Sequence, residues 1–189
     1  MSIPKDHPYW FISDLVEKEG QIDFLSFSYY QYKPQSLVDE RKIFHVKRNC
    51  FFDIEFVSSL MNRNDSMTEL AIHSKVVLSD GTERHIPMVD MATAAKAHLS
   101  KVQILLKEKK LGSFEWFSSG RSFHGYGKIL LNEVEWIHLM GILLLSNQRG
   151  LNPTVDPRWI GHRLLAGYSA LRWTRNSHHY VGIPSSVEI

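Results

Sequence analysis

A ten-residue stretch, Ser118–Gly127, combines small residues with one cation and one imidazole. Its three glycines and three serines allow the backbone to approach a ligand closely, because none of them carries a bulky side chain. Arg121 and His124 supply N–H donors that suit phosphate oxygens. The stretch predicts a phosphate-binding loop between a strand and a helix, although many loops of this composition are plain turns.

A second stretch, Asn49–Phe56, alternates between apolar and acidic residues. Read as a strand, it places Asp53 and Glu55 on one face, about 7 Å apart at Cα, and aromatic and aliphatic residues on the other. Two carboxylates in so apolar a strand are costly unless a cation or hydrogen bonds stabilise them. The alternative is that this face of the strand is simply hydrated.

A third acid, Asp156, follows Val155 at the start of a predicted helix. Together with Asp53, Glu55 and His124 it forms a group of side chains suited to Mg²⁺ or Mn²⁺, which prefer oxygen ligands. Two such ions can activate an attacking hydroxyl and stabilise a leaving phosphate oxygen. In this interpretation Asp53 bridges both ions and the Ser118–Gly127 loop holds a triphosphate.

The elements that must position these residues follow from hydrophobic periodicity and from turn and cap residues. Helices are predicted at 8–19, 93–110, 132–146 and 156–167, the third apolar nearly all round and therefore buried; strands are predicted at 22–32, 43–46, 49–56, 114–117 and 170–174, with a hairpin over 70–89. This order indicates an α+β fold. At 189 residues it suits a single domain, with two small lobes sharing a cleft.

Composition excludes several classes of protein. Cys50 is the single cysteine, so neither an intrachain disulfide nor a cysteine-based zinc module is expected. The longest apolar run, Leu139–Leu145, is far shorter than the roughly 20 residues that span a bilayer. The N-terminus has no signal-peptide character. A cytoplasmic or nucleoid-associated protein without membrane contact is expected.

The basic residues are unevenly distributed. The segment from Arg149 to Asn176 contains five arginines and a single acid, whereas the rest of the chain is net acidic. Aromatic residues interleave with these arginines, a pattern typical of base stacking beside phosphate contacts. Candidate nucleic-acid contacts are Arg158, Trp159, Arg163, Trp173 and Arg175. The competing interpretation is that the arginines pair with surface acids and that the aromatic residues belong to the core.

These motifs together resemble the archaeo-eukaryotic primase superfamily. Asp53-Ile54-Glu55 is similar to its acidic first motif. Ser122-Phe123-His124, preceded by Ser119-Gly120-Arg121, resembles its Ser-x-His second motif. Val155-Asp156 resembles the third motif, a hydrophobic residue followed by Asp. Leu171-Arg172-Trp173 resembles the stretch that follows the third motif in this superfamily. Val89-Asp90 also satisfies the third pattern; Asp156 is preferred because the Arg172 stretch lies beyond it.

The resemblance implies a two-lobed core with an RRM-like sheet and flanking helices, and template-dependent nucleotidyl transfer with two Mg²⁺ or Mn²⁺ ions, by a DNA primase or primase-polymerase. The implied metal ligands and catalytic residues are Asp53, Glu55 and Asp156, and the implied nucleotide-binding residues are Ser119, Arg121, Ser122, His124 and Arg172. No zinc is expected. Implied partners are nucleoside triphosphates, a single-stranded DNA template and a helicase or accessory replication subunit.

Two functions remain open. One is the nucleotidyltransferase, and the other is a nucleic-acid- or nucleotide-binding module that keeps the fold without polymerising. The acidic residues and the histidine favour the enzyme, because a pure binder gains little from negative charge near phosphates. Whether the product is RNA or DNA, and whether synthesis starts without a primer, stays open.

Overall fold

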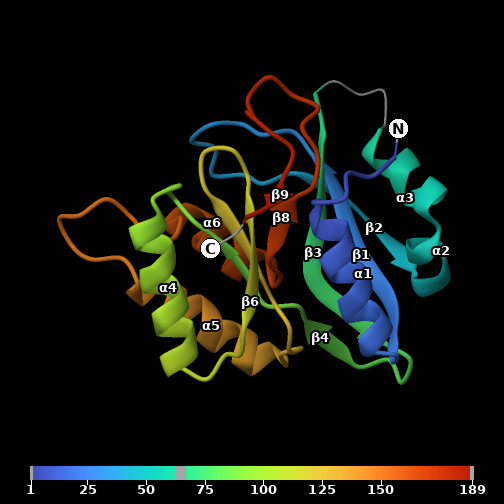
Figure 1. Ribbon diagram of the computed structural model, residues 1–189, viewed down its shortest axis with the longest axis horizontal. Helices are drawn as coiled ribbons and strands as arrows, with labels where there is room; N and C mark the ends of the chain where they lie inside the picture. Colours follow the sequence, from blue (N-terminus) through green and yellow to red (C-terminus); the bar gives the residue numbers. More distant parts are fainter. Residues whose placement is uncertain (1, 63–66, 188–189) are drawn as a thin grey trace.

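The computed structural model describes residues 2–62 and 67–187, and it contains two antiparallel sheets with helices around them (Figure 1). The first sheet consists of β1 (Ile22–Tyr30), β2 (Arg41–Lys47), β3 (Glu69–Leu78), β4 (Glu83–His85) and β8 (Ala170–Arg172). Its order is β2-β1-β3-β4, and β8 pairs with β3 as well. The α+β fold predicted from sequence is confirmed.

The second sheet has the order β5-β7-β6-β9. Its strands are β5 (Met88–Asp90), β6 (Phe114–Ser118), β7 (Phe123–Gly127) and β9 (Ser185–Ser186). The hairpin predicted over residues 70–89 is therefore only half correct. β3 and β4 form it, but Pro87 has no N–H for a ladder, and the chain crosses to the other sheet at β5.

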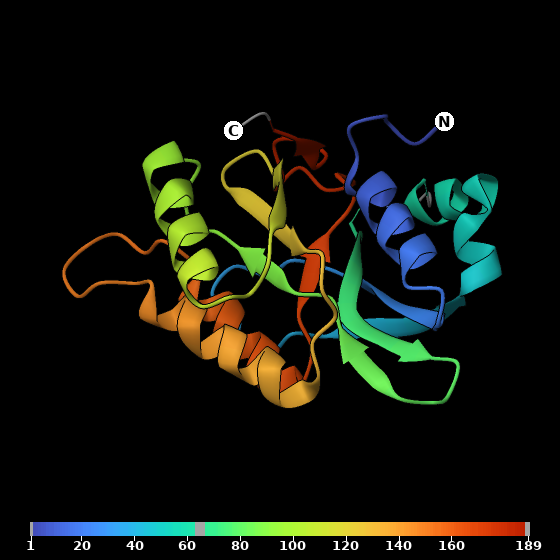
Figure 2. The ribbon, with the colours of Figure 1, turned by 60° about the horizontal axis from the view of Figure 1, so that its bottom comes forward.

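Six helices lie outside the sheets in the part of the chain that the structure describes. They are α1 (Pro8–Lys18), α2 (Arg48–Phe52), α3 (Ile54–Met61), α4 (Lys96–Glu108), α5 (Glu133–Leu145) and α6 (Pro157–Ala166). Helices α1 to α3 lie on one side of the molecule, and α4 to α6 on the other (Figure 2). Between them the two sheets meet.

The buried apolar residues form two main clusters, and strands of the second sheet contribute to both of them. Tyr9 of α1 and Phe27 of β1 belong to the first cluster, while Leu99 of α4 and Trp136 of α5 belong to the second. Trp173, just after β8, is fully buried in the first cluster and lies edge-on to Phe27, with ring centroids 5.3 Å apart. The prediction that Trp173 stacks on nucleic acid bases is therefore wrong.

The prediction of a strand over Asn49–Phe56 is also wrong. These residues form α2 and the start of α3, and Asp53 joins the two helices. The Asp53 carboxylate caps α3 by accepting hydrogen bonds from the backbone N–H groups of Glu55 and Phe56, at 3.0 and 3.1 Å. The apolar residues continue beyond this stretch at helical spacing. Val57 and Met61, four residues apart, form the buried face of α3.

Helix α5 is less buried than its sequence predicts. Trp136, Leu139, Met140 and Leu143 face the second core, but Leu145 is 82% exposed. Because one face of α5 packs on the core and the other does not, the expectation of a helix buried all round is wrong.

The capping role of Asp53 leads to a prediction about stability. Asp53→Ala should lower the free energy of unfolding by about 1 kcal/mol, because the first turn of α3 loses a side-chain acceptor. Asp53→Asn should cost much less, since asparagine also caps helices well. Urea denaturation of both variants tests this, and an equal loss in both would show that the charge of Asp53, and not its capping, stabilises α3.

Candidate active site

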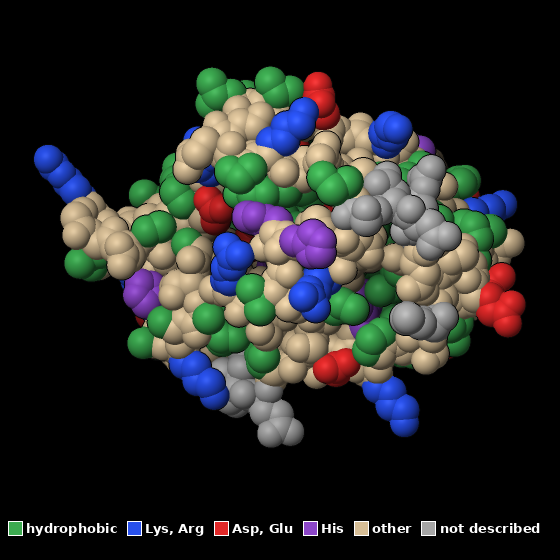
Figure 3. Space-filling view, turned by 90° about the horizontal axis from the view of Figure 1, so that it is seen from above, with side chains coloured by type: hydrophobic (Ala, Val, Ile, Leu, Met, Phe, Trp, Pro, Cys, Tyr) green, Lys and Arg blue, Asp and Glu red, His purple; other side chains and the backbone are tan. Residues whose placement is uncertain are grey.

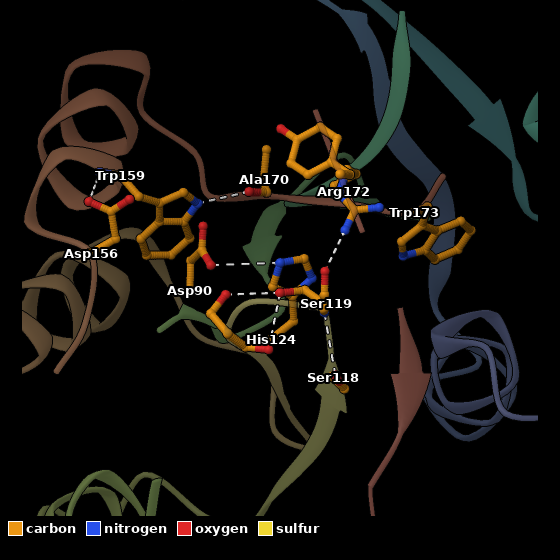
Figure 4. A network of polar contacts seen from close by, with 12 residues as sticks. Asp90, Ser118, Ser119, His124, Asp156, Trp159, Ala170, Arg172 and Trp173 are labelled. Carbon is orange, nitrogen blue, oxygen red and sulfur yellow. Dashed lines mark hydrogen bonds and ion pairs between the residues drawn. The ribbon is translucent and has the colours of Figure 1, made fainter. Parts of the chain in front are cut away.

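The site is built on the pairing of β5 with β7. Asp90, the last residue of β5, lies opposite His124 in the antiparallel register. The Asp90 Oδ1 and His124 Nε2 atoms are 3.6 Å apart (Figure 4). The serine- and glycine-rich stretch is therefore a tight β6–β7 turn followed by a strand, and that strand carries His124.

Trp116 and Gly125 fix which face of the strand carries His124. Neighbouring strand residues point to opposite faces, so His124 faces Asp90 while Gly125 faces the second core. The Trp116 ring covers Gly125 so closely that an added Cβ would lie 2.6 Å from a ring carbon. Only glycine lets β7 lie this close to the indole.

A second carboxylate reaches the site from the start of α6. Val155 forms an isolated bridge with Met91, and the Asp156 N–H donates to the Asp90 carbonyl oxygen at 3.0 Å. The Asp156 side chain caps α6 by accepting from the N–H groups of Arg158 and Trp159 at 2.9 and 3.2 Å. Asp90 and Asp156 are therefore neighbours, although 66 residues of chain separate them.

Burial shapes the protonation of this group. Desolvation, reinforced by the charge of Asp156, raises the pKa of Asp90 to about 8. Desolvation and the nearby Arg172 guanidinium lower the pKa of His124 to about 3, so the imidazole is neutral near pH 7. His124 Nδ1 is buried and has no hydrogen-bond partner among the described residues. A neutral imidazole thus has one nitrogen left for a ligand.

Arg172 of β8 connects the first sheet to the turn that precedes His124. Its guanidinium donates to the Ser119 carbonyl oxygen at 2.9 Å and to the Thr174 carbonyl oxygen (Figure 4). The Tyr180 ring covers it, 4.0 Å from the guanidinium carbon. Within the turn the Ser119 and Ser122 hydroxyls are 2.9 Å apart. Arg172 therefore holds the turn in place and also lines the cavity beside it.

These residues line one cavity of about 460 Å³. Both sheets contribute to it, together with α6 and the segments 31–40 and 179–181. Among the described residues, six basic side chains and three acidic side chains line the cavity. The basic ones are Lys33, Arg41, Arg121, Arg158, Arg163 and Arg172, and the acidic ones are Asp39, Asp90 and Asp156. Figure 3 views the side on which these segments lie, and basic and histidine side chains gather near its middle.

The predicted site residues divide into two groups. Ser119, Arg121, Ser122, His124, Asp156 and Arg172 all line the cavity. Asp53 and Glu55 do not, because they are exposed at the junction of α2 and α3, on the other side of the molecule (Figures 1 and 2). The predicted grouping of Asp53 and Glu55 with Asp156 is wrong.

The predicted nucleic-acid contacts are mostly engaged within the protein. Arg158 donates to the Ser36 carbonyl oxygen at 2.8 Å, and Arg175 to that of Tyr180 at 3.0 Å. Trp159 is half-buried and donates to the Ala170 carbonyl oxygen at 2.9 Å. Arg163 is 1% exposed. The basic segment therefore lines the cavity and its rim, and does not form an open basic face.

The carboxylates fit one divalent cation better than two. No cluster of three or more His, Cys, Asp or Glu side chains suited to a metal occurs in residues 2–62 and 67–187. Mg²⁺, however, is commonly bound through one or two carboxylates plus substrate phosphates. The mutual repulsion of Asp90 and Asp156, which helps to raise the pKa of Asp90, is what a cation between them would relieve.

Asp90 is the cavity residue that sequence reasoning set aside. Val89-Asp90 satisfies the same hydrophobic-Asp pattern as Val155-Asp156, so the signal was present. The pattern alone could not show that both acids line one cavity. The Met91–Val155 bridge and the pairing of β5 with β7 bring Asp90 beside Asp156 and His124.

No helix in the described part of the chain is long and apolar enough to cross a membrane.

The chain combines a two-sheet α+β fold with two carboxylates and a neutral histidine in one basic cavity. The family model for archaeo-eukaryotic primase 1D-like proteins matches residues 51–185, and the chain belongs to this AEP-like family. No curated protein matches the chain at a significant level.

The raised pKa of Asp90 gives a prediction about pH. The folded protein keeps the Asp90 proton up to about pH 8, while the unfolded chain releases it near the ordinary pKa of 3.8. The free energy of unfolding that Asp90 contributes therefore decreases as the pH rises from about 3.8 to about 8. Without divalent cations, Asp90→Asn should be more stable than wild type at pH 8, by on the order of 2 kcal/mol, with a smaller difference at pH 5. Urea denaturation at both pH values measures this; the same difference at both would leave no role for the titration.

The contact between Gly125 and Trp116 gives a second prediction. Gly125→Ala should destabilise the protein by about 1–3 kcal/mol, because the new methyl group collides with the indole. Gly141→Ala on α5 is the control, since an added Cβ meets nothing within 4 Å there. Thermal denaturation compares them; an unchanged melting temperature in Gly125→Ala would mean that the indole moves freely.

Proposed function

We propose that this protein is a nucleotidyltransferase of the primase-polymerase type, which binds a nucleoside triphosphate with a divalent cation in the cavity and adds it to a nucleic acid strand. The observation that carries this proposal is the pair of carboxylates, Asp90 and Asp156, beside the neutral and partly unpartnered His124.

The cavity suits a triphosphate in charge and in size. Its basic side chains outnumber its acids two to one, which favours a polyanion. A volume of about 460 Å³ lies within the range of small-molecule sites. His124 lines the cavity, and its Nδ1 has no hydrogen-bond partner among the described residues. The Ser119 and Ser122 hydroxyls lie in the turn just before it.

Asp90 and Asp156 are the residues that would hold Mg²⁺ or Mn²⁺. When bound, the cation supplies positive charge for the attacking and leaving oxygens of the phosphoryl transfer. Asp90 must lose its proton to bind the cation, so cation binding should strengthen as the pH rises toward 8. The Asp156 carboxylate is already oriented by the two N–H groups that it caps.

A second candidate function is a nucleic-acid- or nucleotide-binding module that does not polymerise. The small number of acids in the cavity favours it, because the third one, Asp39, is paired with Arg41 and Arg163. A strand presents its next side chain to the same face two residues further on. Two residues beyond Asp90 this side chain is that of Ala92, which is not an acid. A helicase or accessory replication subunit and the use of single-stranded DNA as a template belong to the enzymatic proposal alone, whereas both proposals allow a nucleic acid strand to bind.

Calorimetry with a nucleoside triphosphate and MgCl₂ tests the binding step. His124→Ala should weaken affinity about 10- to 100-fold, the equivalent of roughly 1.5–3 kcal/mol for a hydrogen bond to a charged group. Asp53→Asn serves as the control and should bind like wild type, because Asp53 lies outside the cavity. Equal affinity in wild type and His124→Ala would remove His124 from the site.

Primer extension on a single-stranded template separates the two candidate functions. The enzyme should extend the primer with Mg²⁺ or Mn²⁺, and Asp90→Asn and Asp156→Asn should both abolish extension. Nucleotide binding without extension under either cation would favour the binding module.

A further inference from the structure

A carboxylate shared by two arginines lies in the wall of the cavity. Asp39 Oδ2 accepts from Arg41 Nε at 2.7 Å and from Arg163 Nη2. Arg41 comes from β2 and Arg163 from α6, so the contact joins the first sheet to the helix that Asp156 caps. All three residues line the cavity.

The charges at this point do not balance. Two guanidinium groups face one carboxylate, and Arg163 Nη1 is buried without a hydrogen-bond partner in the described part of the chain. The side chains of Arg163 and Arg41 are only 2% and 10% exposed, and burial lowers the pKa of both. Rings cover them, with Tyr168 5.5 Å from the Arg163 guanidinium and Tyr30 4.1 Å from that of Arg41. A buried excess of positive charge with a spare donor is what an anion site requires.

Asp39 reaches the arginines from a segment that belongs to no helix or strand. It lies in residues 31–40, between β1 and β2, and Arg158 holds this segment at the Ser36 carbonyl oxygen. The Asp39 side chain is 25% exposed. The carboxylate thus lies between solvent and the guanidinium groups, at the position a ligand oxygen would take.

We propose that Arg41 and Arg163 form a second phosphate subsite, which Asp39 fills in the free protein and which a backbone phosphate of a polynucleotide strand takes over when the strand binds. A guanidinium fork accepts carboxylate and phosphate oxygens with the same geometry, so one can replace the other. This inference rests on the proposed function, because the polynucleotide that binds to Arg41 and Arg163 is the strand that the nucleotidyltransferase extends.

The position of the subsite favours a strand over the nucleotide. Arg163 lies seven residues along α6 from Asp156, about 10 Å along the helix axis. The triphosphate that Asp156 and His124 would hold therefore lies near the start of α6, and the subsite lies about two turns further along the helix. Six basic side chains against three acids also leave positive charge for a second anion.

Asp39→Asn tests the exchange directly, because it keeps the shape of the side chain and removes the competing charge. Fluorescence anisotropy with a labelled, unstructured oligothymidine, titrated at several salt concentrations, measures the affinity. We expect Asp39→Asn to bind about 3- to 10-fold more tightly and with a salt slope steeper by about 0.7, the value for one added phosphate contact on a single strand. Asp14→Asn is the matched control, since it removes the same charge at an exposed ion pair on α1.

The arginines must account for the gain. Adding Arg163→Gln or Arg41→Gln to Asp39→Asn should abolish the tighter binding, and two separate arginine variants allow for one that fails to fold. Circular dichroism checks that each protein is folded. Unchanged oligonucleotide affinity in folded Asp39→Asn, or a gain that survives loss of either arginine, would overturn the proposal.

A parallel titration with a nucleoside triphosphate and MgCl₂ distinguishes the subsite from the proposed function. Asp39→Asn should leave nucleotide affinity within about twofold of wild type. A gain for the nucleotide alone would overturn the assignment to a strand. If no nucleotide binds to any variant but the oligonucleotide gain is present, the subsite stands and the nucleotidyltransferase proposal fails.

Discussion

The structure depends on the hydrogen bonds that the buried guanidinium of Arg172 donates. A charge 4% exposed must be hydrogen-bonded or it destabilises the fold, and Arg172 is satisfied by two backbone carbonyl groups. One belongs to Thr174, two residues after the end of β8, and the other to Ser119 in the turn of the second sheet. The same interaction that satisfies the charge therefore joins the two sheets and holds the turn that leads to His124. Burial lowers the pKa of the His124 imidazole, and the positive charge of Arg172 lowers it further, so His124 is neutral.

Around this connection the site is assembled from short pieces that are far apart in the chain. Asp90 ends a three-residue strand, His124 lies on the neighbouring strand, and Asp156 starts a helix. Each is fixed by backbone pairing or capping, so the three segments meet at the cavity before any ligand is present. The cost of this arrangement is visible in Asp90, whose pKa is raised by burial and, in addition, by the charge of Asp156.

Much of the fold could be predicted from the sequence, because most helices and strands show clear periodicity and end at caps such as Asp156 and Gly167. The candidate site could be predicted only in part. His124 was found through the Ser-x-His motif, and Asp156 was chosen over Asp90 only because the Arg172 stretch lies beyond it. Asp53 was misassigned because a capping aspartate between short helices mimics an alternating strand. Asp90 could not be chosen from the sequence, since what distinguishes it is the strand paired beside it. Burial of Trp173 is likewise a property of packing, not of residue type.

The late position of β8 has a consequence for synthesis of the chain on the ribosome. Strand β3 pairs with β1 through neighbouring stretches of sequence, but its other edge pairs with β8, about 100 residues further along. Until Ala170–Arg172 leaves the ribosome, part of β3 has an open edge that can pair with another nascent chain. The first sheet is thus begun early and closed late, and the residues that close it also complete the cavity. A chain that stops short of β8 would be a target for chaperones, whatever helices it had already formed.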